Sequence, residues 1–349
     1  MGKLHLLKNS RPETKNKVIT FSIVIALFLF SMIWIEGGFS SSQFAGLMVP
    51  ICYYVILAVS LNLTVGILGE LSLGHAGFMC IGAYAGSVTS LYLQDAIPQA
   101  LIRFPIAVLI GGVVAAIFGV LIGIPILRLK GDYLAIVTLA FGEIIKSVAN
   151  NIKISIPALN SENMVVINGP QGITGTPKDS TFINAFILLI ITLIVILNFI
   201  DSRSGRAVKA IRDNRIAAET TGLNVTRYKL IAFALSAFFA GVAGVLYSHN
   251  INNLSATTKN FGYTQSIMIL VMVVLGGIGS IRGSIIAAIF LTLIPELLRG
   301  LQDYRMLIYS IILIIAMLLN SSSKFAALKE KYGPKSLIKK LFKKKEVQE

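Results

Sequence analysis

Residues 202–230 read SRSGRAVKAIRDNRIAAETTGLNVTRYKL, a charged segment within an otherwise apolar chain. An uncharged run long enough to cross a lipid bilayer lies on each side of this segment. The segment carries seven cations: Arg203, Arg206, Lys209, Arg212, Arg215, Arg227 and Lys229. Cytoplasmic loops of membrane proteins collect Lys and Arg, so we expect this segment to lie in the cytoplasm, where it is accessible to a soluble partner.

The composition of the chain indicates an all-α polytopic membrane protein. Hydrophobic residues make up 55% of the chain and charged residues only 13%, against about 25% charged in soluble domains. The apolar runs are continuous rather than alternating, which favours transmembrane helices over a β-barrel. The net charge of +15 is therefore attributed to cytoplasmic loops rather than to nucleic-acid binding. Cys52 and Cys80 lie in apolar runs and are expected to be small buried residues without a disulfide.

We predict about ten transmembrane helices, with both termini in the cytoplasm. This orientation places most of the 31 Lys and Arg residues on the cytoplasmic side. The predicted domain consists of residues 18–320, between a basic tail (1–17) and a lysine-rich tail (321–349) expected near anionic lipid. The ten spans are 18–35, 45–67, 72–93, 104–127, 131–151, 181–200, 229–248, 264–280, 284–298 and 306–320.

Small residues at four-residue spacing predict close helix packing within the membrane. They occur as Gly82/Gly86, Gly119/Gly123, Ala237/Gly241 and Ala240/Gly244. The start of the third span, Gly69–Gly77, is rich in glycine and polar groups, and it predicts an interrupted helix. Irregular backbone at that depth requires protein or a water-filled cavity around it.

The longest predicted external loop, residues 152–181, contains the turn-forming sequence NGPQGITG at 168–175. Long ordered loops are often functional. An external partner site, a lid and an inert connection all remain open for this loop.

Enzyme motifs are absent from the sequence. It contains neither G-x-x-x-x-G-K-[ST] nor H-E-x-x-H, so no ATP-binding P-loop is expected. His5, His75 and His249 are too widely separated to predict a metal site. The sequence GGIGSIRG at 276–283 is interpreted as a tight cytoplasmic turn.

Polar residues inside the predicted spans have two possible roles. Glu143 lies near the middle of a span, where burying a carboxylate costs about 2.5–3.5 kcal/mol, and Lys146 lies on the same helix face. The pair either lines a path through the membrane or fixes helix packing as an internal ion pair. Asn62 and Glu70 have the same ambiguity, and His75 is either a satisfied hydrogen-bonding group or a gating residue.

The central cytoplasmic loop, residues 201–228, is predicted to contain two short helices, which we call the knob. In the first, Ser204 caps a helix that runs through Asp213, and Lys209 pairs with Asp213. The knob either fits a groove on a soluble partner or lies on the lipid headgroups as an amphipathic segment.

The second helix of the knob has a capping residue at each end. Asn214 is expected to cap a helix over Arg215–Thr221. Gly222 is expected to end it in a left-handed conformation, with Leu223 packing back. Thr226 is then expected to cap the next span.

Five stretches of the sequence resemble the LivM-type permease subunits of branched-chain amino acid ABC importers. The resemblance covers about residues 45–320. The stretches are LSLGHAGFMCIGAYAG (71–86), GDYLAIVTLAFGEIIK (131–146), NGPQGITG (168–175), the central segment (202–230) and VVLGGIGSIRGS (273–284).

This resemblance implies a non-catalytic transmembrane subunit of an importer in the bacterial cytoplasmic membrane. Such a subunit pairs with a second homologous permease, two cytoplasmic ATPase subunits and an extracytoplasmic binding protein. ATP and Mg²⁺ then belong to the ATPases, and no cofactor is expected on this chain. The implied fold is the ten-helix cobalamin-importer type, in which the loop after the sixth span carries the coupling helix.

The resemblance also implies roles for particular residues. Contacts with the ATPases are expected at Arg212, Asn214, Ile216, Ala217, Ala218, Glu219 and Gly222, where the sequence departs from the usual E-A-A pattern of the family. The candidates for the substrate path come from the residues themselves and not from the resemblance; they are Asn62, Gly74, His75 and Glu143. The implied substrates are leucine, isoleucine and valine. The alternative function is an ion-coupled secondary transporter of a small zwitterion, which requires carboxylates within the membrane.

Overall fold

The computed structural model describes residues 42–129, 131–157 and 164–298, together with isolated positions at 22 and 24 and between 304 and 318. The basic tail 1–17, the lysine-rich tail 321–349, almost all of the first predicted span and about half of the last predicted span lie outside the described residues. The chain divides into two units, Met1–Thr292 and Leu293–Glu349, and the architecture below is that of the first unit.

Helices dominate the described part of the chain, and most coincide with predicted spans. Pro50, Pro105 and Pro125 lie inside long helices. The helices are α2 (Ser42–Asn62), η1 (Leu63–Leu68), α3 (His75–Tyr92), α4 (Ala100–Ile126), α5 (Asp132–Asn151), η2 (Gly169–Gln171), α6 (Phe182–Asp201), α7 (Arg203–Asp213), α8 (Arg215–Thr220), α9 (Val225–Ser248), α10 (Thr258–Phe261), α11 (Tyr263–Gly276) and α12 (Ile281–Leu297).

Four helices of the described part are long and apolar enough to cross a membrane. They are Gly46–Leu68, Ala100–Ile126, Phe182–Asp201 and Val225–Ser248. Helices α3, α5, α11 and α12 occupy the positions of four further predicted spans, but α11 has only 14 residues and α12 only 17. The count of ten spans therefore stays a prediction.

Helices α3, α4 and α9 pack with their backbones in close approach. A Cβ atom at Gly82 of α3 would lie 2.3 Å from the Cα of Gly241 in α9, and one at Gly244 would lie 2.1 Å from the carbonyl oxygen of Met79. Any larger residue at these positions would therefore force the helix backbones to shift. The packing predicted from the small-residue pairs is confirmed here.

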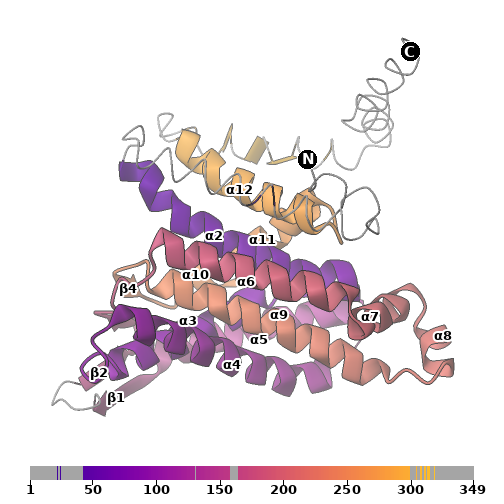
Figure 1. Ribbon diagram of the computed structural model, residues 1–349, viewed down its shortest axis with the longest axis horizontal. Helices are drawn as coiled ribbons and strands as arrows, with labels where there is room; N and C mark the ends of the chain where they lie inside the picture. The colour runs from indigo at the N-terminus through magenta and orange to yellow at the C-terminus, as the bar shows by residue number, and fades with distance from the viewer. Residues whose placement is uncertain are drawn as a thin grey trace, which may run out of the picture. The chain divides into compact units, whose positions relative to one another are not determined.

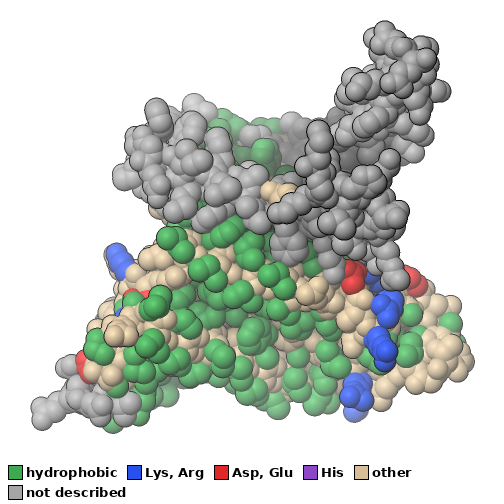
Figure 2. All heavy atoms as spheres, in the orientation of Figure 1, with side chains coloured by type: hydrophobic (Ala, Val, Ile, Leu, Met, Phe, Trp, Pro, Cys, Tyr) green, Lys and Arg blue, Asp and Glu red, His purple; other side chains and the backbone are tan. Residues whose placement is uncertain are grey.

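The outward surfaces of the bundle are apolar. Leu109, Ile117 and Leu121 of α4 and Ile187 and Ile191 of α6 are exposed. Figure 2 shows hydrophobic side chains covering the middle of one face, with Lys and Arg side chains gathered near α7. This distribution suits a protein surrounded by lipid.

The two ends of the bundle differ in structure. The two knob helices, α7 and α8, lie at one end, whereas the strands lie at the other (Figure 1). Strand β1 (Lys153–Pro157) pairs antiparallel with β2 (Met164–Asn168), and β3 (Ile173–Thr174) pairs antiparallel with β4 (Asn253–Leu254). The predicted external loop is thus partly ordered and is tied to the segment that follows α9.

Candidate functional site

The second helix of the knob has the predicted caps. The side chain of Asn214 accepts a hydrogen bond from the backbone N–H of Ala217 at 3.0 Å. Gly222 has a φ of +83°, and the N–H of Leu223 returns to the carbonyl oxygen of Ala218 at 3.1 Å. The predicted left-handed helix end is therefore confirmed, although α8 ends at Thr220, one residue earlier than predicted.

Two of the other predicted caps are wrong. Ser202, not Ser204, caps α7 by accepting from the N–H of Gly205 at 3.1 Å, because its backbone is extended while Ser204 is already helical. Asn224, not Thr226, caps α9 for the same reason.

The predicted ion pair within the first knob helix is also different. Lys209 does not pair with Asp213. The carboxylate of Asp213 instead accepts from its neighbour Arg212, at 3.1 Å from Nε and 2.9 Å from Nη2.

The residues of α8 divide between an outward and an inward face. Ile216 is 74% exposed and Ala217 is exposed. Glu219 is also exposed and pairs with Arg215 at 2.9 Å. Ala218 is only 4% exposed and lies in a small core with Ile211 and Val225, against which Leu223 and Tyr228 pack. Ala218 therefore packs inside the knob, and the outward face of α8 is exposed.

Two cations of the charged segment 202–230 contact the chain just after α2. Nη1 of Arg212 donates to the carbonyl oxygen of Gly66 in η1 at 2.9 Å. Lys229, in the first turns of α9, is buried and forms an ion pair with Glu70. The sequence predicts Lys229 only as one of the seven cations of the cytoplasmic segment 202–230. Two features of the sequence could have indicated this pair. Lys229 lies beside a long apolar run, and Glu70 lies near the end of another predicted span.

Asn62 is fully buried and joins three segments. Its Nδ2 donates to Oγ of Ser284 in α12 at 2.8 Å. Its Oδ1 accepts from the N–H of Gly279 at 2.8 Å. Asn62 therefore connects the end of α2 with the turn at 277–280 and the start of α12.

The predicted interruption before α3 is confirmed. Gly69 has a φ of +80°, and α3 begins only at His75. Two hydroxyl groups hold the interrupted segment, because Oγ1 of Thr138 accepts from the N–H of Leu73 at 3.0 Å and Oγ of Ser266 accepts from the N–H of Ala76 at 3.1 Å.

Gly74 and His75 are packed tightly within this junction. A Cβ atom at Gly74 would lie 2.3 Å from the carbonyl oxygen of Thr138. His75 is 2% exposed, and its Nε2 lies 2.8 Å from Oγ of Ser60. Ser236 of α9 in turn donates to the carbonyl oxygen of Ser60 at 2.6 Å. The histidine thus has a hydrogen-bonding partner, and the junction brings together α2, α3, α5, α9 and α11.

Glu143 lies apart from the other candidate path residues. It forms an ion pair with Lys146, and its Oε1 accepts from the backbone N–H of Tyr263 at 2.7 Å. Lys146 also donates to Oγ1 of Thr258 at 3.2 Å. A carboxylate beside the first backbone N–H groups of α11 is stabilised by the positive end of the helix dipole. These contacts favour the packing role over the path-lining role.

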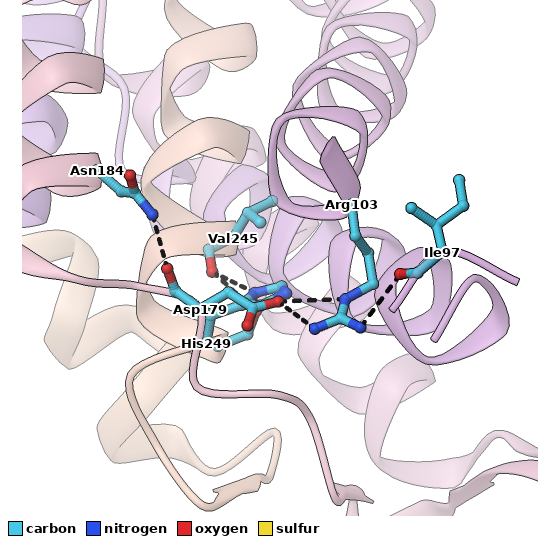
Figure 3. A network of polar contacts seen from close by, with 7 residues as sticks. Ile97, Arg103, Asp179, Asn184, Val245 and His249 are labelled. Atoms are coloured by element: carbon cyan, nitrogen blue, oxygen red, sulfur yellow. Dashed lines mark hydrogen bonds and ion pairs between the residues drawn. The ribbon is translucent and has the colours of Figure 1, made fainter. Parts of the chain in front are cut away.

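A buried ion pair near the opposite end was not found from the sequence. Arg103 donates from Nη2 and Nε to Oδ2 of Asp179 at 2.7 and 3.2 Å (Figure 3). Asn184 donates to the backbone oxygen of Asp179 at 3.0 Å. His249 lies beside the pair, its Nδ1 2.9 Å from the carbonyl oxygen of Val245. The signal in the sequence was a cation, Arg103, directly before a predicted span.

The family described as "Branched-chain amino acid transport system / permease component" matches residues 43–317. The chain belongs to this family. The permease is 34% identical over 299 residues to the high-affinity branched-chain amino acid transport system permease protein LivM of Salmonella typhimurium and 35% identical over 299 residues to LivM of Escherichia coli. Each alignment covers 76% of this permease and 66% of the relative, so the permease spans just under two thirds of their length.

A more distant relative carries the name of a sugar permease. The ribose import permease protein RbsC of Haemophilus influenzae is 24% identical to this permease over 310 residues, which cover 85% of this chain and 90% of that protein. No solved structure gives a significant match. The apolar helices and these relatives together identify an integral membrane permease component.

Proposed function

We propose that this permease carries leucine, isoleucine and valine across the bacterial cytoplasmic membrane as the transmembrane subunit of an ATP-driven importer. The observation that carries the proposal is the match to LivM proteins at 34% and 35% identity, against 24% to the sugar permease. Its proposed partners are a second homologous permease, two ATPases that hold ATP and Mg²⁺, and an extracytoplasmic binding protein.

The proposed mechanism is alternating access. ATP binding closes the two ATPases, which move the knob, and the helices rock about a central pathway. A conformational change requires contacts that differ between the two states. The outward face of α8, around Ile216 and Glu219, is free to make such contacts. The full architecture proposed is the ten-span cobalamin-importer type with both termini inside.

Uptake of radiolabelled leucine tests the proposal. It is measured in cells of the source strain from which the gene has been deleted and then restored. We expect the restored gene to raise uptake, excess isoleucine or valine to suppress it, and ribose to leave it unchanged. Competition by ribose but not by valine would contradict the proposed substrate.

The energy source is tested in the same cells. Depletion of ATP with arsenate is expected to abolish uptake, whereas a protonophore at maintained ATP is not. Uptake that survives the loss of ATP but is abolished by the protonophore would favour the ion-coupled alternative. Among the described acids, the ion-paired Glu143 lies deepest within a helix and is the candidate for that alternative.

A further inference from the structure

A continuous set of contacts runs from the knob to α12. It begins with the hydrogen bond from Arg212 to the carbonyl oxygen of Gly66 at 2.9 Å. It continues where η1 lies against the turn at 277–280, and it ends with the hydrogen bonds of Asn62 to Gly279 and Ser284, each 2.8 Å long. The sequence predicts none of these pairings.

The middle of this set is a π-helix, an arrangement that often marks functional sites. η1 spans six residues, Leu63–Leu68, and ends at Gly69 in the left-handed conformation. The carbonyl groups in the last turn of a helix have no helical N–H ahead of them. Gly66 belongs to that turn, and the guanidinium of Arg212 satisfies its carbonyl oxygen with a charged donor, which suits the negative end of a helix.

The backbones of η1 and the turn are in direct contact. A Cβ atom at Gly66 would lie 2.3 Å from the backbone nitrogen of Gly279 and 2.0 Å from Oδ1 of Asn62. Gly279 itself has a φ of +84°. Because no side chain of residue 66 separates η1 from the turn, a displacement of Gly66 is passed directly to Gly279.

Asn62 fixes how the turn and α12 follow η1. Its amide is fully buried and uses both its oxygen and its nitrogen. Breaking either bond leaves a buried polar group without its partner, which is unfavourable. The turn and the start of α12 are consequently held in a fixed position relative to the end of α2 and to η1.

We propose that Arg212 and Asn62 are positioning residues that transmit movement of the knob, through η1, to the turn at 277–280 and the start of α12. The inference rests on the proposed function, because it assigns the path by which ATPase movement reaches the membrane helices. The separate ion pair of Lys229, in the first turns of α9, with Glu70 does not involve Arg212 and is expected to remain when the Arg212 contact is lost.

The test uses the complex purified through a tagged permease and reconstituted in vesicles with its binding protein. The readout is ATP hydrolysed per radiolabelled leucine transported, which a purely structural role does not change. For Arg212→Gln we expect this ratio to rise about tenfold and for Arg212→Lys much less. Arg206→Gln is the matched control, because Arg206 is exposed and donates to the backbone of Asp201 at the adjacent helix end; its ratio should equal that of the original protein.

Ser284→Ala supplies a mild variant at the far end of the path, with Asn62→Ala as the stronger one. Ser284→Ala is expected to raise the ratio several-fold without changing the leucine concentration for half-maximal uptake. In the double variant with Arg212→Gln, the increase should be smaller than the product of the single effects, because both changes interrupt one path.

Three results would overturn the inference. In the first, Arg212→Gln lowers hydrolysis and uptake in parallel, as expected if Arg212 contacts only the ATPase. In the second, the effects of Arg212→Gln and Ser284→Ala multiply independently. In the third, the original complex shows no ATP-dependent uptake, which would remove the proposed function as well, whereas the first two results leave that function intact.

Discussion

Replacing Gly222 by valine tests whether the shape of the knob is needed for transport. Gly222 has a φ of +83°, and no atom lies within 4 Å of the position that a Cβ would occupy. The penalty is therefore one of backbone conformation and not of collision. Holding a β-branched residue in the left-handed region costs about 1–3 kcal/mol.

This penalty acts on a helix with little stability of its own. α8 has six residues, far below the length at which an isolated helix is stable, so it depends on its caps and on Ala218. A penalty of about 2 kcal/mol lowers the population of the capped knob about 30-fold relative to uncapped forms. The bonds lost are those from Gly222 to Glu219 at 3.0 Å and from Leu223 to Ala218 at 3.1 Å.

We expect Gly222→Val to reduce leucine uptake by about tenfold or more while the permease stays in the membrane. Two variants serve as controls. Gly222→Asn should retain most uptake, because asparagine tolerates the left-handed region. Gly175→Val introduces the same strain at a φ of +80° with open space around it, but near the strand end of the bundle, and should affect uptake less. Normal uptake by Gly222→Val, or equal losses in all three variants, would show that transport does not depend on the left-handed end of α8.

Three further substitutions test the packing contacts. Gly82→Ala should destabilise the permease by about 1–3 kcal/mol, seen as a lower midpoint of thermal unfolding in detergent, because the added Cβ meets Gly241; an unchanged midpoint would contradict the close approach. Lys229→Met should cost about 3 kcal/mol by leaving Glu70 without its partner, and the added change Glu70→Leu should restore part of the loss; no recovery would argue against the pair. Glu143→Ala should lower the unfolding midpoint more than Glu143→Gln, which keeps an acceptor; equal effects would contradict its packing role.

Local features of the structure were predictable from the sequence because their chemistry spans few residues. The caps at Asn214 and Gly222 lie within four residues of the groups they satisfy. The helix positions followed from continuous apolar runs, and the interruption before His75 followed from its glycines. The sequence does not distinguish Ser204 from Ser202 as the cap of α7, because two serines two positions apart offer the same cap and only the backbone angles distinguish them.

Contacts between distant residues were not predictable from the sequence. Arg212 and Gly66 are separated by 146 positions, and Asn62 and Gly279 by 217. One partner in each contact is a backbone group, which carries no signature in the sequence. The π-helix η1 was likewise hidden within an apolar run that predicts only a continuous span.

Cross-linking from the outward face of the knob shows whether the knob docks on an ATPase subunit, as we propose. Cys52 and Cys80 are buried, so a cysteine introduced by Ile216→Cys at the 74% exposed site is the preferred target of a bifunctional reagent in the assembled, transporting complex. We expect a product that joins the permease to an ATPase subunit, in a yield that changes when ATP is added. Modification of the introduced cysteine without any protein cross-link, in a complex that still transports leucine, would contradict it.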